Sequence, residues 1–152
     1  SSFLRSVAWM LRDYLIGAGG KSGPLWKEKV GPWIKASWPR SANKKTSETT
    51  YRLVWAALHS SDYFDQAIAD ITPFICQTDQ SGALFLIDHD NDQLGYIEKF
   101  PEQVLSLLVI LVGDRDPVHD DSLVRVLMKI GAAAPELAND MRFLDLQRRA
   151  AA

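Results

Sequence analysis

The sequence predicts an all-α protein, and three observations support this fold class. Apolar residues recur at three- and four-residue spacing through almost the whole chain, as they do on the buried face of a helix. Glycine and proline interrupt these stripes where helices are expected to begin and end. Strand-like alternating runs joined by a hairpin turn do not appear. We expect stacked antiparallel helical hairpins, with a short HEAT-like solenoid as one arrangement of them.

The first half of the chain contains four apolar stripes of helical period. The pair Gly31-Pro32 lies inside the second stripe and is expected to kink or split its helix. Pro73 lies near the end of the fourth stripe and is expected to bend that helix or end it early. The four expected helices span about residues 3–16, 24–38, 46–60 and 62–75.

The second half contains the clearest helix, over residues 101–112, which is apolar on most faces and is therefore expected in the middle of a core. Residues 83–88 (ALFLID) before it fit either a strand or a helical turn. A further stripe covers about residues 121–134. Pro135 is expected to start the last helix, with its inward side chains at Ala138, Met141 and Leu144.

Length and composition indicate one globular domain, residues 1–152, since 47% of the residues are hydrophobic and 24% are charged. The longest nearly unbroken apolar run, residues 104–112, is about half of what a membrane-spanning helix needs. The single cysteine, Cys76, fits a reducing compartment, so we expect a cytoplasmic protein. The chain starts with Ser1-Ser2-Phe3 inside an apolar pattern, and we expect a carboxy-terminal fragment of a larger protein.

Charge is distributed unevenly, and this is the most informative bulk property of the chain. Residues 1–60 carry ten Lys or Arg against three Asp or Glu, whereas residues 61–152 carry seven against sixteen. All five tryptophans lie in the basic part. In residues 21–45 cations interleave with tryptophans, as they do in grooves that bind phosphates and stack bases. The candidate partner or nucleic-acid surface consists of Lys27, Lys29, Lys35, Trp38, Arg40, Lys44 and Lys45.

The same segment has two structural interpretations. Trp26, Val30, Trp33 and Ile34 recur at helical spacing, so the tryptophans can be packing anchors while the lysines face solvent. Alternatively, a basic amino-terminal layer stacks on the acidic remainder of the chain.

Three alternating aspartates, Asp88, Asp90 and Asp92, occupy the first ligand positions of an EF-hand calcium loop. The position that needs glycine is Gln93, and the position that needs a bidentate carboxylate is Lys99, which opposes metal binding. We therefore expect an aspartate- and asparagine-rich loop between helices, whose side chains close turns on the backbone.

No other motif indicates an enzyme. His59, His89 and His119 lack the spacing that places two metal ligands on one helix face, and they are expected to be solvated loop residues. Cys76 follows an apolar stripe without an adjacent cation, as a buried, unreactive thiol does. The stretch GAGGKSG (17–23) lacks phosphate-loop spacing and follows a helix where a strand is needed. We expect no cofactor and no metal.

The carboxy-terminal third, residues 100–149, resembles the helical end regions of large bacterial multidomain proteins. The similar features are Phe100-Pro101 before a leucine-rich helix, a Gly-Asp-rich loop, and a helix ending in Ala-Pro-Glu-Leu; Trp38-Pro39-Arg40 before a polar loop is similar too. Many such proteins are implicated in phage defence, and some carry a sirtuin-like NAD-consuming domain far upstream. The resemblance implies a scaffold or sensing module in such a protein and carries over no catalytic residue.

These observations predict a non-enzymatic helical interaction module of a larger cytoplasmic bacterial protein. Its partners would be other domains of the parent chain or other proteins. The alternative is a helical domain that binds nucleic acid through residues 21–45.

Overall fold

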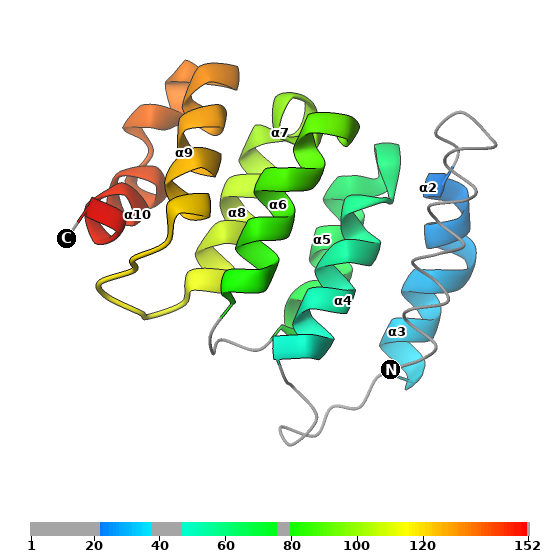
Figure 1. Ribbon diagram of the computed structural model, residues 1–152. Helices are drawn as coiled ribbons and strands as arrows, with labels where there is room; N and C mark the ends of the chain where they lie inside the picture. The colour runs from blue at the N-terminus through cyan, green and yellow to red at the C-terminus, as the bar shows by residue number, and fades with distance from the viewer. Residues whose placement is uncertain (1–21, 38–46, 76–79, 152) are drawn as a thin grey trace. The chain divides into compact units, whose positions relative to one another are not determined.

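The computed structural model describes residues 22–37, 47–75 and 80–151, and within these ranges it contains only helices and the turns between them (Figure 1). The prediction of an all-α fold is confirmed, while the HEAT-like solenoid stays a prediction. The chain forms two compact units, Ser1–Thr78 and Asp79–Ala152. The α-helices are α2 (Ser22–Leu25), α3 (Gly31–Ser37), α4 (Ser47–Leu58), α5 (Phe64–Ile71), α6 (Ser81–Leu94), α7 (Tyr96–Lys99), α8 (Pro101–Val112), α9 (Asp121–Ala133) and α10 (Met141–Ala151).

In unit 1, α2 continues into α3 through a π-helical segment, Trp26–Val30. Gly31 keeps ordinary right-handed helical angles, with φ −59° and ψ −52°, and its N–H bonds to the carbonyl of Trp26, five residues back. The predicted disturbance at Gly31-Pro32 therefore takes the form of a widened turn just before the proline and not of a break between two helices.

The core of unit 1 forms where α5 packs against both α3 and α4. The first helical segment, which runs continuously from α2 to α3, buries three large side chains: Trp26, Val30 and Ile34. The helix α5 ends at Ile71 and gives way to a 3₁₀ turn, Thr72–Phe74, as predicted from Pro73. The remaining core side chains of unit 1 are Leu53, Val54, Ala56, Ala57, Leu58, Phe64, Ala67, Ile68, Ile71, Phe74 and Ile75.

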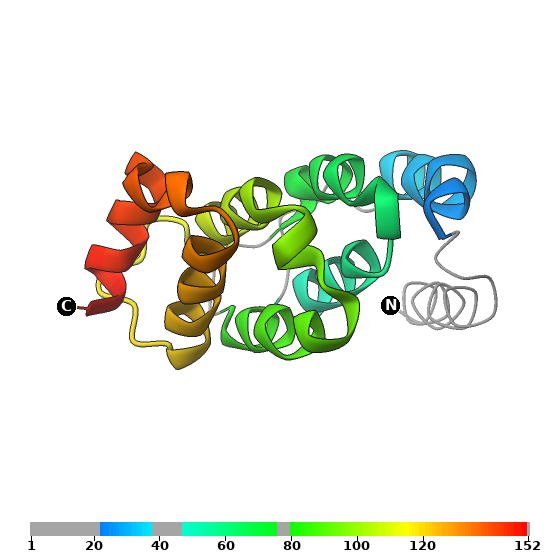
Figure 2. The same ribbon diagram turned by 90° about the horizontal axis from the view of Figure 1, so that it is seen from above.

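In unit 2, α9 contacts α6, α7, α8 and α10, and so occupies the middle of the unit (Figures 1 and 2). Its buried row is Leu123, Val126, Leu127 and Ile130, as the sequence predicts. Residues 83–88 belong to α6, which settles the choice between strand and helix. The helix α8 is buried along most of its length and ends at Gly113, whose φ of 59° favours glycine.

The predicted inward face of the last helix is wrong. Pro135–Asn139 forms a 3₁₀ helix, Asp140 is extended with ψ 138°, and α10 begins only at Met141. This break resets the helical phase, so Phe143 and Leu146 point inward while Met141 is 80% exposed and Leu144 is exposed as well. The short segment before α10 is held by a hydrogen bond from the N–H of Asp140 to the carbonyl of Leu137.

Arg149 is buried in the same helix because it anchors the α8–α9 loop. Its Nη1 donates to the carbonyls of Gly113 and Arg115 at 2.8 and 2.7 Å, and its own carbonyl accepts from the N–H of Val118. A buried guanidinium that satisfies backbone carbonyls stabilises a loop which otherwise has little regular structure.

Within the described ranges, no helix combines the length and the apolar content that crossing a bilayer requires.

Candidate functional site

The structure describes three of the seven residues of the predicted basic surface. Lys27, Lys29 and Lys35 are exposed on the first helical segment of unit 1. Lys35 is engaged, because its Nζ lies 3.0 Å from Oδ1 of the buried Asp70. The other four candidates, Trp38, Arg40, Lys44 and Lys45, lie outside the described residues.

The described lysines do not converge with an exposed tryptophan. Lys27 and Lys29 are two positions apart in a helix, and side chains at this spacing do not face each other. Trp26 between the cations is fully buried and donates from Nε1 to Oδ2 of Asp70 at 3.0 Å. Trp33 is half-buried. Trp26 is therefore a packing anchor, as one of the two structural interpretations holds.

The basic character of the first half of the chain also lies mostly outside the described residues. Residues 22–37 and 47–75 together carry four Lys or Arg against five Asp or Glu. Residues 1–21 and 38–46 carry six Lys or Arg against one Asp. The described part of unit 1 is thus close to neutral.

The three alternating aspartates lie on the helix α6 and not in a loop, so the expected aspartate-rich loop is wrong. The helix continues through them to Leu94 and ends at Gly95, which adopts the left-handed conformation with φ 68°. Asp92 is exposed, and the side chain of Asp90 bonds Nδ1 of His89 at 3.1 Å.

Asp88 is the buried member of the three, and it joins α6 to α9. Its Oδ2 accepts from Nε of Arg125 at 2.7 Å, and its Oδ1 accepts from Nζ of Lys129 at 2.8 Å. Burial alone would raise the pKa of Asp88, but the bonds from Lys129 and Arg125 outweigh it and hold the pKa below its ordinary value. The carboxylate is fully used in packing two helices together.

The histidines occupy different environments, and the expectation of solvated loop residues holds for only one of them. His119 is exposed in the α8–α9 loop. His89 is exposed but helical, with its ring stacked on the exposed Phe85 at 5.5 Å between centroids. His59 is buried, and its Nδ1 lies 2.8 Å from the carbonyl of Trp55. Cys76 and most of residues 17–23 lie outside the described ranges.

Within the described ranges, the His, Cys, Asp and Glu side chains form no group of three or more that could hold a metal ion. Burial is the main cause that raises the pKa of Tyr96, with the nearby carboxylates adding to it. Its hydroxyl donates to the carbonyl of Ile87. The three buried groups with shifted pKa values, Asp70, Asp88 and Tyr96, thus all form hydrogen bonds within their own unit.

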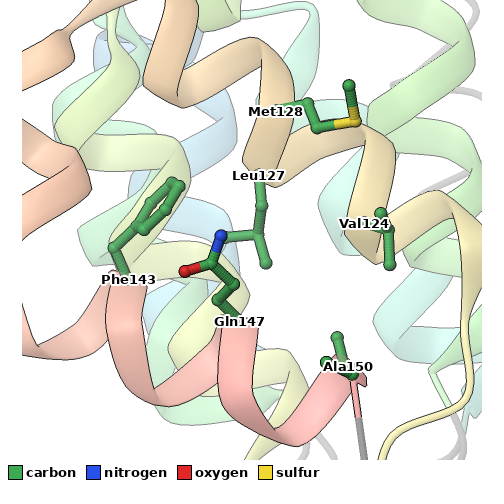
Figure 3. Close-up of a pocket in the computed structure, with 7 residues that line it drawn as sticks. Val124, Leu127, Met128, Phe143, Gln147 and Ala150 are labelled. Carbon is green, nitrogen blue, oxygen red and sulfur yellow. The ribbon is translucent and has the colours of Figure 1, made fainter.

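An apolar groove with a volume of about 260 Å³ lies between α9 and α10. Figure 3 shows Leu127 and Gln147 pointing toward one another between the two helices. Neither helix contributes a charged side chain to its lining. The labelled lining residues are Val124, Leu127, Met128, Phe143, Gln147 and Ala150.

The groove exposes large apolar side chains to solvent. Met128 is 70% exposed and Val124 is 40% exposed, one helical turn apart on α9. Phe143 lies opposite Gly131, where an added Cβ would meet its ring at 3.6 Å. Because Gly131 has no side chain, the two helices leave space beside Phe143.

Sequence reasoning missed this groove. The inward stripe of α9 was predicted correctly, but Val124 and Met128 lie beside this stripe and were not recognised as an exposed apolar row. Their i, i+4 spacing forms a second apolar row, which is the signal that could have revealed the surface.

No protein-family model, curated protein or solved structure matches this chain.

Proposed function

We propose that the chain is a helical interaction module that docks a helix of a protein partner in the α9–α10 groove. The groove carries this proposal because it is apolar, uncharged in its lining, and bordered by the exposed Met128 and Val124. Grooves between two helices take up the apolar face of an amphipathic helix, and methionine adapts well to varied partners.

The rest of the described chain supports a binding role. The two buried carboxylates with lowered pKa values, Asp70 and Asp88, bond neighbouring helices and are not among the residues that line the groove. The helix α9 is also held on several sides by α6, α7 and α8, so its exposed row is presented by a rigid element. A preorganised surface of this kind loses little conformational entropy on binding.

The biological setting rests on the resemblance of residues 100–149 and on the composition of the chain. It would place this non-enzymatic module in a larger cytoplasmic bacterial protein, with phage defence as the context. Partners would then be other domains of the parent chain or separate proteins.

A selection from a library of helical peptides tests the docking function. Peptides that bind the 152-residue chain are counter-screened against Met128→Lys and Val124→Lys, which place a charge in the groove. Met141→Lys is the matched control, since Met141 is exposed but does not line the groove. Peptides that no longer bind the two groove variants but still bind Met141→Lys support the proposal. Peptides that bind the groove variants as tightly as the wild type contradict it.

Nucleic-acid binding by residues 21–45 is the second candidate. The observation that favours it is the exposure of Lys27 and Lys29, neither of which has an ion-pair partner among the described residues. The further cations Arg40, Lys44 and Lys45 follow them in the sequence. Fluorescence anisotropy with labelled single- and double-stranded DNA and RNA across a salt series tests it. Micromolar binding that weakens steeply with salt and falls in Lys44→Glu/Lys45→Glu supports it, and absence of binding near physiological salt excludes it.

A further inference from the structure

The partner helix can be specified further if the groove is the docking site proposed above. We infer that the α9–α10 groove takes a basic amphipathic helix, one whose apolar row enters the groove while lysines or arginines flank it. The inference rests on charge complementarity between such a helix and unit 2.

Unit 2 is strongly acidic where the structure describes it. Residues 80–151 carry twelve Asp or Glu against seven Lys or Arg, a formal charge of −5. An approaching basic helix is therefore attracted over a distance comparable to the screening length of the solution, about 8–10 Å at moderate salt.

The cations on the two helices of the groove, α9 and α10, are already paired with carboxylates of unit 2. On the two helices of the groove, Arg125 and Lys129 bond Asp88, and Arg148 bonds both Asp116 and Asp145. Arg142 bonds Asp140 and Glu102, and Arg149 bonds Asp145. Acidic partners would have to break these pairs, whereas basic partners would not.

Two exposed carboxylates that have no cation partner within the described residues lie just before and just after the groove residues of α9. Asp121 lies one helical turn before Val124 in α9, and it is exposed. Glu136 is exposed in the 3₁₀ helix that follows α9. Both side chains are free of hydrogen bonds and ion pairs within the described residues, so each can accept a cation of the partner.

The direction of the groove agrees with this placement. Gly131 near the end of α9 faces Phe143 near the start of α10, while Val124 shares the lining with Ala150 near the end of α10. The two helices are therefore antiparallel along the groove, which runs from the Asp121 end of α9 to its Glu136 end. A bound helix with apolar side chains at i and i+4 in the groove presents flanking cations to both carboxylates.

Three synthetic peptides of about 18 residues test the inference by fluorescence anisotropy with the 152-residue chain. They share one row of leucine and phenylalanine at helical spacing and carry lysine, glutamate or glutamine at all other positions. The lysine peptide is expected to bind most tightly and to weaken as salt is added.

Two pairs of variants connect binding with the groove. Met128→Gln removes an apolar contact in the groove, and Met141→Gln makes the same change outside it. Asp121→Asn/Glu136→Gln removes the two carboxylates, and Asp62→Asn/Asp65→Asn removes the same charge from exposed positions of unit 1. All six changed positions are exposed, and an unchanged circular dichroism spectrum shows that each variant is folded.

We expect Met128→Gln to lower the affinity for the lysine peptide about tenfold, and Asp121→Asn/Glu136→Gln to lower it roughly two- to tenfold. The two control variants should bind this peptide as tightly as the wild type does. If the glutamate or glutamine peptide binds as tightly and loses affinity with Met128→Gln, the basic partner is excluded while the docking function stands. The inference is overturned if Met128→Gln leaves the affinity for the lysine peptide unchanged, or if none of the three peptides binds. The peptide-library selection then decides the docking function separately.

Discussion

The indole Nε1 of Trp26 donates a hydrogen bond of 3.0 Å to Oδ2 of Asp70, which joins the π-helical segment to α5 across 44 positions of sequence. Gly31 makes this bond possible, because a Cβ at that position would lie 2.8 Å from Oδ2 of Asp70 and 3.2 Å from Nε1 of Trp26. Lys35 and Gln66 bond the other carboxylate oxygen, at 3.0 Å each. One buried carboxylate thus holds two helices of unit 1 together.

Gly31→Ala should destabilise unit 1 by about 1–3 kcal/mol, because the added methyl group must displace the carboxylate or the indole. All five tryptophans lie in residues 1–60, so urea unfolding followed by tryptophan fluorescence reports this unit. In an Asp70→Ala background most of the cost should disappear. An equal cost in both backgrounds would show that the clash is elsewhere.

Acid should remove the contribution of Asp70 to stability. Burial alone would raise its pKa, but the bonds from Trp26, Gln66 and Lys35 hold the pKa below the ordinary value of 3.8. A lowered folded-state pKa gives stability that is complete above the unfolded-state value and is lost as pH falls through the folded-state value. The difference in free energy of unfolding between wild type and Asp70→Asn should therefore shrink below about pH 4.

The control for this pH profile is Asp65→Asn, which changes an exposed carboxylate of the same helix that has no bonding partner among the described residues. The part of the pH dependence that the Asp65→Asn profile does not share is the contribution of Asp70. A profile for Asp70→Asn that does not differ from that of Asp65→Asn would contradict the assigned network.

Asp88→Ala should destabilise unit 2 by about 1–3 kcal/mol, because it leaves Arg125 and Lys129 without their carboxylate between α6 and α9. Far-UV circular dichroism during urea unfolding measures the loss, since residues 79–152 contain no tryptophan. Asp92→Ala is the control, as its carboxylate is exposed and 3.5 Å from Lys129. Equal losses in the two variants would show that Asp88 is no more important than a surface charge.

The helices that the sequence predicted well are those whose signals are local. The helix α8 is apolar on most faces and lies between Phe100-Pro101 and Gly113, and the stripe of α9 keeps one phase throughout. Neither signal depends on a distant partner, so the period alone predicts both segments.

The errors arise where distant residues or a change of phase decide the structure. The run from Asp88 to Asp92 has weak helix formers, yet it stays helical in a segment where Asp88 bonds residues 37 and 41 positions away. The extended Asp140 shifts the phase before α10, so counting from Pro135 placed Met141 and Leu144 inward. The groove depends on both α9 and its packing against α10, which no local pattern specifies.

The cap at the start of α9 gives a sharper test, because two neighbouring aspartates differ in role. Oδ1 of Asp120 accepts from the N–H of Leu123 at 3.0 Å, whereas Asp121 is exposed and makes no such bond. Asp120→Ala should cost about 1 kcal/mol of stability in unit 2, and Asp121→Ala should cost less than half of that. Thermal and urea unfolding by circular dichroism measure both, and the reverse order would show that the cap is misassigned.

Glycine to alanine should have opposite effects at two positions of unit 2. Gly131 is helical within α9, and an added Cβ would meet the ring of Phe143 at 3.6 Å, an ordinary packing distance. Gly131→Ala should therefore stabilise by roughly 0.5–1 kcal/mol through reduced backbone entropy of the unfolded chain. Gly95 has φ 68°, so Gly95→Ala should destabilise by about 1 kcal/mol although its Cβ would have room. Urea midpoints by circular dichroism that move in the same direction would contradict this assignment of backbone conformation.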